Sequence, residues 1–202
     1  MVKDGVYYAL GLGSAAGLLM WLVHPAAGAP LVAAALFCLY FFRDPDREIP
    51  SGPVAVSPAD GKIVEVRPAG GGARRISIFL NVFDVHVNRC PVGGIITDVR
   101  YTPGKFRVAS LEAASAENEQ NTLVVDDSRS RVVFKQIAGL IARRIVCHKK
   151  VGDRVETGER FGMIKFGSRM DVVLGPEWEL AVTQGERVKA GSSILARRRE
   201  AK

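Results

Sequence analysis

The sequence has few cysteines and few aromatic residues. The first shortage argues against disulfide and zinc sites, and the second argues against nucleic-acid binding. Its three cysteines, Cys38, Cys90 and Cys147, are odd in number and show no CxxC spacing. Neither a disulfide framework nor a zinc site is therefore indicated, and a reducing compartment is expected. Aromatic residues form 7% of the chain and rarely lie between basic residues. Although the net charge is +7, this is a poor pattern for binding nucleic acid.

Charged side chains are missing from residues 5–42, a stretch of 38 residues. At about 1.5 Å per helical residue, this is too long for one crossing of a hydrocarbon core about 30 Å thick. His24-Pro25 and Gly28-Ala29-Pro30 interrupt it and predict a turn between two helices. Residues 1–42 are therefore expected to form a membrane-associating hydrophobic helical hairpin. Its first helix is long enough to span, whereas the second is short and suits a re-entrant or interfacial position.

Basic residues flank this apolar segment on both sides. Lys3 precedes it, and Arg43 and Arg47 follow it. The positive-inside rule then puts both ends, and the domain that follows, on the cytoplasmic side of the cell membrane. A secretory signal is the alternative, because Lys3, an apolar run and "AAGA" fit that outline. Cleavage would leave the second apolar run at a new N-terminus, so the hairpin is favoured.

Residues 43–202 show the pattern of a mainly β domain. Turn residues recur about every 8–12 residues between short apolar runs, which is typical of a sandwich or barrel. The expected strands are "VAVSP", "GKIVEVRP", "RRISIFLNV", "VHVNRCPV", "GIITDVRYT", "NTLVVDD", "RVVFKQIAG" and "IARRIVC". Only "FRVASLEAASAENEQ" lacks this pattern, and it is expected to be a loop or a short helix.

An internal repeat lies near the C-terminus. Residues 151–164 and 183–196 share the pattern G-[DE]-R-V-x-x-G-x-x-[FIL], in which each glycine permits a tight turn. The pattern resembles the hammerhead turn of biotinyl and lipoyl carrier domains, so a flattened β-sandwich or barrel is predicted. In those domains the first unit leads into a hairpin that carries a modified lysine. The corresponding position here is Ser168, preceded by Gly167.

Three motifs follow the apolar segment, which ends in "FFRDP". They are "SPADGKI" (57–63), "FDVHVNRCPVGG" (83–94) and "FGSR" (166–169). In this order they resemble the phosphatidylserine decarboxylase family in its short, membrane-bound form, from about Phe41 to the C-terminus. The resemblance implies a proenzyme that cleaves itself between Gly167 and Ser168. It would yield a β chain of residues 1–167 and an α chain of residues 168–202, and Ser168 would become a pyruvoyl cofactor, with no metal.

The chemistry of the family accounts for these residue types. Ser168 Oγ would attack the carbonyl of Gly167, and β-elimination and hydrolysis would then leave the pyruvoyl group. Serine is a weak nucleophile without a base, and Asp60 and His86 are the candidates for base and orienting carboxylate. The pyruvoyl ketone would form a Schiff base with phosphatidylserine, and loss of CO₂ would give phosphatidylethanolamine, a step of phospholipid biosynthesis.

One departure from the family concerns the histidine segment. The long bacterial form has H-x-x-H there, whereas this chain has His86 followed by Arg89. Whether His86 serves processing, proton return after decarboxylation, or both is therefore left open. Basic candidates for the lipid phosphate or carboxylate are Arg89, Lys105, Arg107 and Arg169.

The expected partners are phosphatidylserine and anionic membrane lipid, together with the chain's own α and β fragments. The family implies a dimer of these fragments, and no nucleic acid is expected. Two alternatives stay open. One is a decarboxylase of another lipid-linked serine, such as an archaeal ether lipid. The other is a non-enzymatic biotinyl- or lipoyl-like carrier, which needs a lysine where the chain has Ser168; Lys165 falls three places early.

Overall fold

The computed structural model describes residues 2–105, 117–139, 144–165 and 168–199 of the chain. Contacts within the chain divide it into two compact units, Met1–Asp46 and Arg47–Lys202. The expected loop or helix at 106–120 lies mostly outside the described residues, although Gln120 begins a strand.

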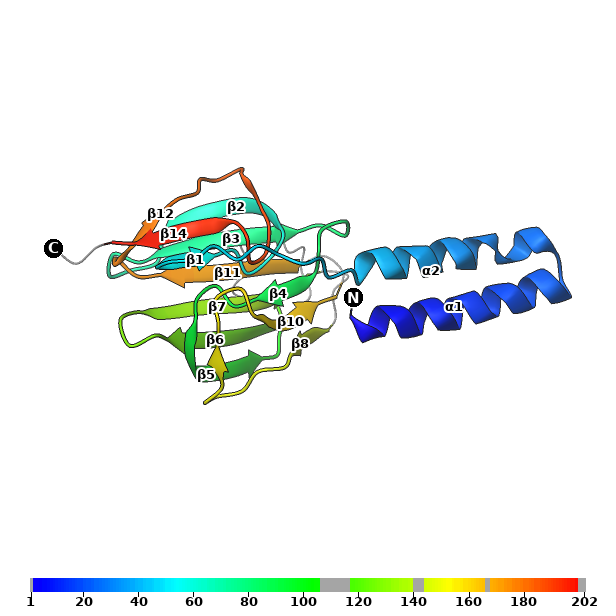
Figure 1. Ribbon diagram of the computed structural model, residues 1–202, viewed down its shortest axis with the longest axis horizontal. Coiled ribbons are helices and arrows are strands. Elements are labelled where there is room, and N and C mark those ends of the chain that lie inside the picture. The colour runs from blue at the N-terminus through cyan, green and yellow to red at the C-terminus, as the bar shows by residue number, and fades with distance from the viewer. Residues whose placement is uncertain (1, 106–116, 140–143, 166–167, 200–202) are drawn as a thin grey trace. The chain divides into compact units, whose positions relative to one another are not determined.

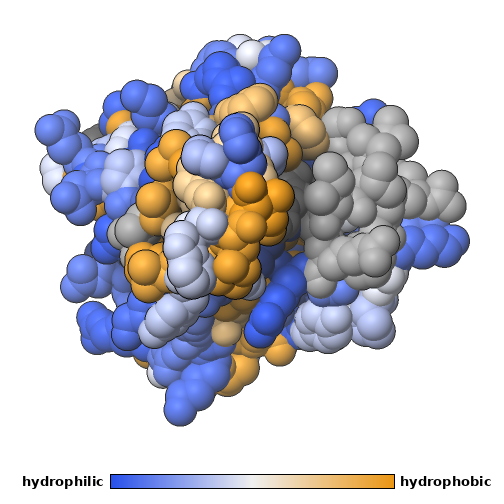
Figure 2. Space-filling view, turned by 90° about the vertical axis from the view of Figure 1, so that its right-hand side faces the viewer, coloured by the Kyte–Doolittle hydropathy of each residue, from blue (hydrophilic) through white to orange (hydrophobic). Residues whose placement is uncertain are grey.

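The first unit is the expected helical hairpin. Helix α1 (Lys3–Leu22) and helix α2 (Ala29–Phe41) lie side by side, joined by the 3₁₀ turn Pro25–Gly28 (Figure 1). A Cβ on Gly28 would come within 2.5 Å of Met20, so glycine permits this close approach. Helix α1 is long and apolar enough to cross a membrane. Most of its large apolar side chains are exposed. Figure 2 shows hydrophobic residues, in orange, on the surface that faces the viewer.

The second unit consists of β-strands in its described part, so the predicted mainly β class is confirmed. The strands are β1 (Val54–Val56), β2 (Gly61–Pro68), β3 (Arg74–Leu80), β4 (Val87–Arg89), β5 (Gly94–Thr102), β6 (Gln120–Asp126), β7 (Arg131–Ala138), β8 (Ile145–Cys147), β9 (Arg154–Val155), β10 (Arg160–Ile164), β11 (Ser168–Leu174), β12 (Trp178–Leu180), β13 (Arg187–Val188) and β14 (Ile194–Arg198).

These strands form three sheets. The largest is a curled sheet in the order β13-β2-β3-β11-β7-β6-β5-β9 (Figure 1). Two three-stranded sheets, β1-β14-β12 and β4-β10-β8, complete the unit. All the strand pairs are antiparallel. Strand β11 therefore has a hydrogen-bonded neighbour on each side, near the middle of the large sheet.

The two repeat segments occupy matching places in this topology. In each segment the first strand, β9 or β13, forms one edge of the large sheet, and the second, β10 or β14, is the central strand of a small sheet. Gly158 and Gly191 have φ angles of 78° and 77°, in the left-handed region that favours glycine. The likeness to carrier domains stays a prediction, but the tight turns expected of the repeat are present.

The repeat extends to an earlier part of the chain that the sequence pattern did not reveal. Gly158 donates its backbone N–H to Cys90 O, and Gly191 donates its own to Ser57 O, both at 2.8 Å. Cys90 and Ser57 are 33 residues apart (90 − 57), as are the two glycines (191 − 158). The segments "SPADGKI" and "CPVGGII" thus make equivalent contacts.

The core lies between the large sheet and the two small ones. Alternate residues of β11, namely Met170, Val172 and Leu174, belong to one buried apolar cluster with side chains from all three sheets. Phe134 on β7 and Phe161 on β10 meet edge to face, with ring centroids 5.1 Å apart. Burying each such side chain stabilises the fold by about 1.5–3 kcal/mol, so the position of β11 is firmly determined.

Candidate active site

Ser168 is the first residue of β11 and is fully buried. It lies opposite Leu80 of β3 and Ala138 of β7. Its Oγ atom has no hydrogen-bond partner among the described residues. Leaving a buried polar group unsatisfied costs about 1–3 kcal/mol, so an orphan of this kind requires an explanation. Its expected partner in cleavage, Gly167, lies outside the described residues.

His86 is also fully buried, just before β4. Its Nδ1 atom lies 2.9 Å from the backbone oxygen of Asp84. A carbonyl oxygen only accepts hydrogen bonds, so Nδ1 must carry the proton. In the neutral ring, Nε2 is then the nitrogen that carries the lone pair, and a lone pair on a ring nitrogen is what a general base requires.

The loop before His86 is fixed by its own hydrogen bonds. The carboxylate of Asp84 accepts from the backbone N–H of Asn81 at 2.9 Å and forms an ion pair with Arg187. Asp84 N in turn donates to Asn81 O at 3.0 Å. The oxygen that orients the imidazole is therefore held in place by a closed turn.

Strand pairing brings His86 close to the chain that leads into Ser168. Strand β4 pairs with β10, and Ile164 N donates to His86 O at 3.4 Å. Ile164 precedes Ser168 by four residues, so the two residues lie at most about 14 Å apart even if the chain between them is fully extended. Two residues that are 82 positions apart (168 − 86) are thus held in one region of the fold.

Asp60 lies at the same end of the large sheet but has other partners. Asp60 immediately precedes β2. In the sheet, Lys62 of β2 lies opposite Phe79 of β3, and Phe79 lies opposite Arg169 of β11. Its carboxylate accepts from Arg47 Nη2 at 2.8 and 2.9 Å and from Ala190 N at 2.8 Å. Among the described residues, no hydrogen bond joins Asp60 to His86 or Ser168.

The internal repeat gives Asp60 a counterpart for comparison. The equivalent position 33 residues later is Gly93, so the carboxylate is present in one unit only. A catalytic role for Asp60 stays a prediction. The contacts it makes in the structure hold the end of β2 against the turn that precedes β14.

A chain of buried amides lies beside His86, and the sequence reasoning missed it. Gln136 Nε2 donates to Val146 O at 3.2 Å, which fixes the orientation of the amide because a carbonyl can only accept. Gln136 then accepts from Asn121 Nδ2 and donates to Asn88 Oδ1, both at 3.0 Å. Asn88 Nδ2 is left buried with no partner among the described residues.

Asn88 lies in β4, two positions after His86, which immediately precedes that strand. Asn88 Nδ2 is thus a second buried polar atom without a partner among the described residues, two positions along the chain from His86. The signal in the sequence was polar residues at positions that a strand would bury, in "VHVNRC" and "VFKQIAG".

The basic residues named as phosphate candidates lie in different environments. Arg169 is 1% exposed and bonds to Asp171, Glu65 and Ser77. Arg89 Nη1 donates to Gly158 O at 3.0 Å, and Lys105 pairs at the surface with Glu117. Arg107 lies outside the described residues. Arg169 therefore has a place in the interior rather than at a lipid-facing surface.

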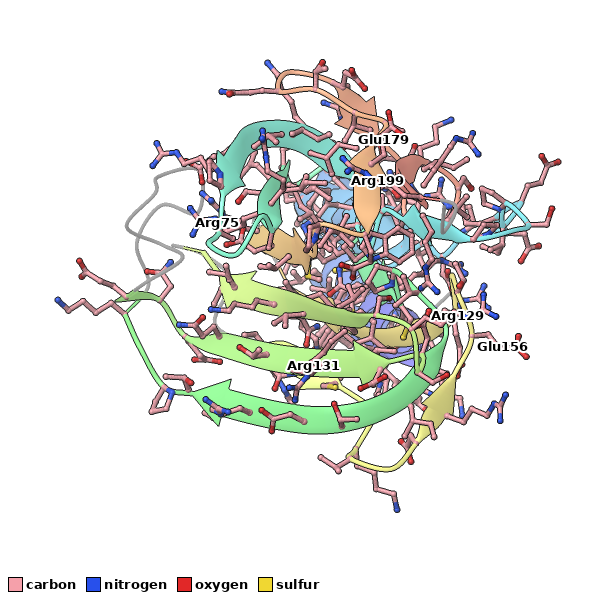
Figure 3. The ribbon with its side chains drawn as sticks, turned by 90° about the vertical axis from the view of Figure 1, so that its left-hand side faces the viewer. Arg75, Arg129, Arg131, Glu156, Glu179 and Arg199 are labelled. Carbon is pink, nitrogen blue, oxygen red and sulfur yellow. The ribbon has the colours of Figure 1, made fainter. Side chains whose placement is uncertain are left out.

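Two surface cavities lie away from these residues. One, of about 560 Å³, includes Asp127, Arg154 and Glu156 in its lining. The other, of about 410 Å³, includes Glu179 and Arg199, which lie close to each other in Figure 3. Neither lining includes Ser168, His86 or Asp60. Among the described residues, no cluster of three or more His, Cys, Asp or Glu side chains is placed to hold a metal ion.

Known proteins resemble the chain over most of its length. The profile of the family described as "Phosphatidylserine decarboxylase" matches residues 34–196. A protein of Solibacter usitatus named phosphatidylserine decarboxylase proenzyme is 63% identical over 202 residues, which cover 100% of this chain and 98% of the relative. Proteins of the same name from Solidesulfovibrio magneticus and Chlorobium chlorochromatii are 48% and 46% identical, over 90% and 88% of this chain and 86% and 84% of their own lengths.

Proposed function

The chain belongs to the phosphatidylserine decarboxylase family, and we propose that it cuts its own backbone between Gly167 and Ser168 and then converts phosphatidylserine to phosphatidylethanolamine and CO₂. The observation that carries this proposal is the buried Oγ of Ser168, which has no hydrogen-bond partner in the described structure. A hydroxyl in that state fits a group that is consumed by a reaction.

Cleavage begins with Ser168 Oγ. As the oxygen adds to the Gly167 carbonyl, its proton leaves to a base and the C–N bond breaks, so that an ester replaces the amide. Loss of the Cα proton of Ser168 then expels the Gly167 carboxylate and leaves a dehydroalanine. Addition of water releases ammonia and leaves a pyruvoyl group at residue 168. Each step conserves atoms and needs no oxidant.

His86 is the base that the geometry favours. Its Nδ1 proton is held by Asp84 O, so that Nε2 carries the lone pair that would accept the proton of Ser168. Asp60 would act on this pair indirectly, through Arg47 and the end of β2. The side-chain amide of Asn88, two residues after His86, has an N–H without a partner among the described residues and would add a hydrogen-bond donor.

In the mature enzyme the pyruvoyl group supplies an electrophilic carbonyl that withdraws electrons as CO₂ leaves. His86 would then return a proton to the substrate carbon, because its imidazole is fully buried and lies near the chain that leads into residue 168. The walls around residue 168 exclude water, which strengthens electrostatic effects at the site. A carrier function is disfavoured, since residue 168 is a serine and not a lysine.

The hairpin would hold the enzyme at its substrate. Helix α1 is 20 residues long, enough for a hydrocarbon core about 30 Å thick. Lys3, Arg43 and Arg47 would keep both ends on the cytoplasmic side of the cell membrane, where anionic lipid attracts a basic protein. The functional unit would be the complex of the α and β chains, assembled as a dimer.

Turnover by matched variants tests the proposal. The wild-type protein should release CO₂ from phosphatidylserine in detergent micelles, and Ser168→Ala should release none. Ser193→Ala is a suitable control, because Ser193 lies in the turn before β14 and its Oγ atom accepts a hydrogen bond from the backbone N–H of Lys189 at 2.9 Å. Equal release of CO₂ by the wild type and Ser168→Ala would exclude this mechanism.

A further inference from the structure

Arg169, the residue next to Ser168, carries a buried charge whose partners lie on both sides of the proposed cut. Its Nε atom donates to Asp171 at 2.8 Å, within the same strand. Its Nη2 atom donates to Glu65 of β2 at 3.0 Å and to Ser77 of β3 at 2.6 Å. After cleavage, Arg169 and Asp171 would belong to the α chain, whereas Glu65 and Ser77 would belong to the β chain.

The acceptor Glu65 is itself held in place. Arg75, labelled in Figure 3, donates to its Oε2 atom at 2.8 Å, and Arg67 contacts its Oε1 atom at 2.6 Å. The side chain of Glu65 is 11% exposed and that of Asp171 is 2% exposed. In Glu65, the guanidinium of Arg169 therefore meets an acceptor that two other arginines already hold in place.

Cleavage would remove one of the restraints that hold residue 168 in the sheet. Before the cut, Ser168 is held by the chain on both sides. Afterwards it is the first residue of β11, a chain end in the middle of an eight-stranded sheet. A pyruvoyl group also lacks the backbone N–H of the serine from which it forms, so residue 168 loses a donor to the sheet. Chain ends without such ties fray.

We propose that Arg169 is a positioning residue that clamps the new end of the α chain to the β chain and so keeps residue 168 in register for decarboxylation. The inference rests on the proposed self-cleavage. A buried guanidinium resists displacement, because moving it would leave its own charge and that of its partners unpaired in the interior. The planar guanidinium also donates its hydrogen bonds in fixed directions, whereas a lysine ammonium does not.

The clamp predicts a defect that appears only after cleavage. Arg169→Lys should mature fully and carry one pyruvoyl group per α chain, measured by reaction with a hydrazide. Its kcat should fall about 10- to 100-fold, the cost of a misplacement near 1 Å, with KM changed little. Arg100→Lys is the matched control, since Arg100 also pairs with an acid two residues away, Asp98, but its side chain is 73% exposed.

Thermal unfolding separates a clamp from a general structural role. Arg169→Lys should lower the melting temperature more in the cut protein than in the uncut Ser168→Ala background, where the backbone still restrains the strand. An equal decrease in both forms, or an unchanged kcat, would overturn the proposal. If Arg169→Lys does not fold, Ser77→Ala decides, because it removes one acceptor without unpairing a charge; an unaltered kcat there would also overturn it. A wild type that stays in one piece would instead refute the proposed function.

Discussion

Replacing His86 tests the proposed general base for Ser168. His86→Ala removes both the imidazole and its hydrogen bond to Asp84 O. A general base contributes about 10²–10⁴-fold to rate, so self-cleavage should slow by that factor. Because His86 is fully buried, the change also leaves a cavity and an unsatisfied carbonyl, and the latter alone costs about 1–3 kcal/mol of folding stability.

The assay must therefore separate slow chemistry from poor folding. Precursor translated in vitro would be followed by gel electrophoresis over hours to days, with circular dichroism on the same samples. His148→Ala is the control histidine variant, because His148 is exposed and its backbone N–H bonds to Phe161 O in either case. It should mature like the wild type.

The fully matured fraction of His86→Ala gives a second result. If His86 also returns the proton to the substrate carbon, this fraction should bind phosphatidylserine but release little phosphatidylethanolamine. Folded His86→Ala that matures and turns over at the wild-type rate would refute both roles.

Three further changes test other parts of the account. Asp60→Asn should slow self-cleavage less than His86→Ala, because Asp60 contacts Arg47 and Ala190 rather than the histidine; a rate equal to the wild type by electrophoresis would remove it from the site. Deleting residues 1–42 should leave a protein that still cleaves itself but sediments with vesicles only at low salt; tight binding in high salt would locate the anchor elsewhere. Burial, and then the nearby charge of Glu159, raises the pKa of Cys90 to about 12, so the folded state keeps a proton that the unfolded state loses. Between about pH 9 and 12 this lowers stability by about 1.4 kcal/mol per pH unit, and Cys90→Ala should flatten that slope in urea titrations.

The sequence predicted the strands well where alternation was regular. The run "GKIVEVRP" coincides with β2, and "GIITDVRYT" coincides with β5. The hairpin turn was also predicted, because proline and glycine interrupt an otherwise uniform apolar run. The turns of the repeat were predictable for a similar reason, since only glycine readily adopts the left-handed conformation found at Gly158 and Gly191.

The contacts between distant segments were not predictable in the same way. Local periodicity says which residues face the core but not which strands meet, so the pairing of Asp60 with Arg47 was missed. The duplicated contact of Ser57 and Cys90 was hidden because backbone atoms make it, and the two segments share only a proline, a glycine and an isoleucine. Arg169 was one of four basic candidates for the lipid phosphate or carboxylate, because a charged residue in a strand suggests an exposed side chain until its partners are known.

The mass of the purified protein tests the central claim most directly. Intact mass spectrometry of the denatured wild type should give two chains, of residues 1–167 and 168–202, and the smaller should be lighter by one ammonia than its sequence requires, since its first residue carries a ketone in place of an amine. Ser168→Ala should give one chain. A single wild-type chain of full mass in an active preparation would contradict the account.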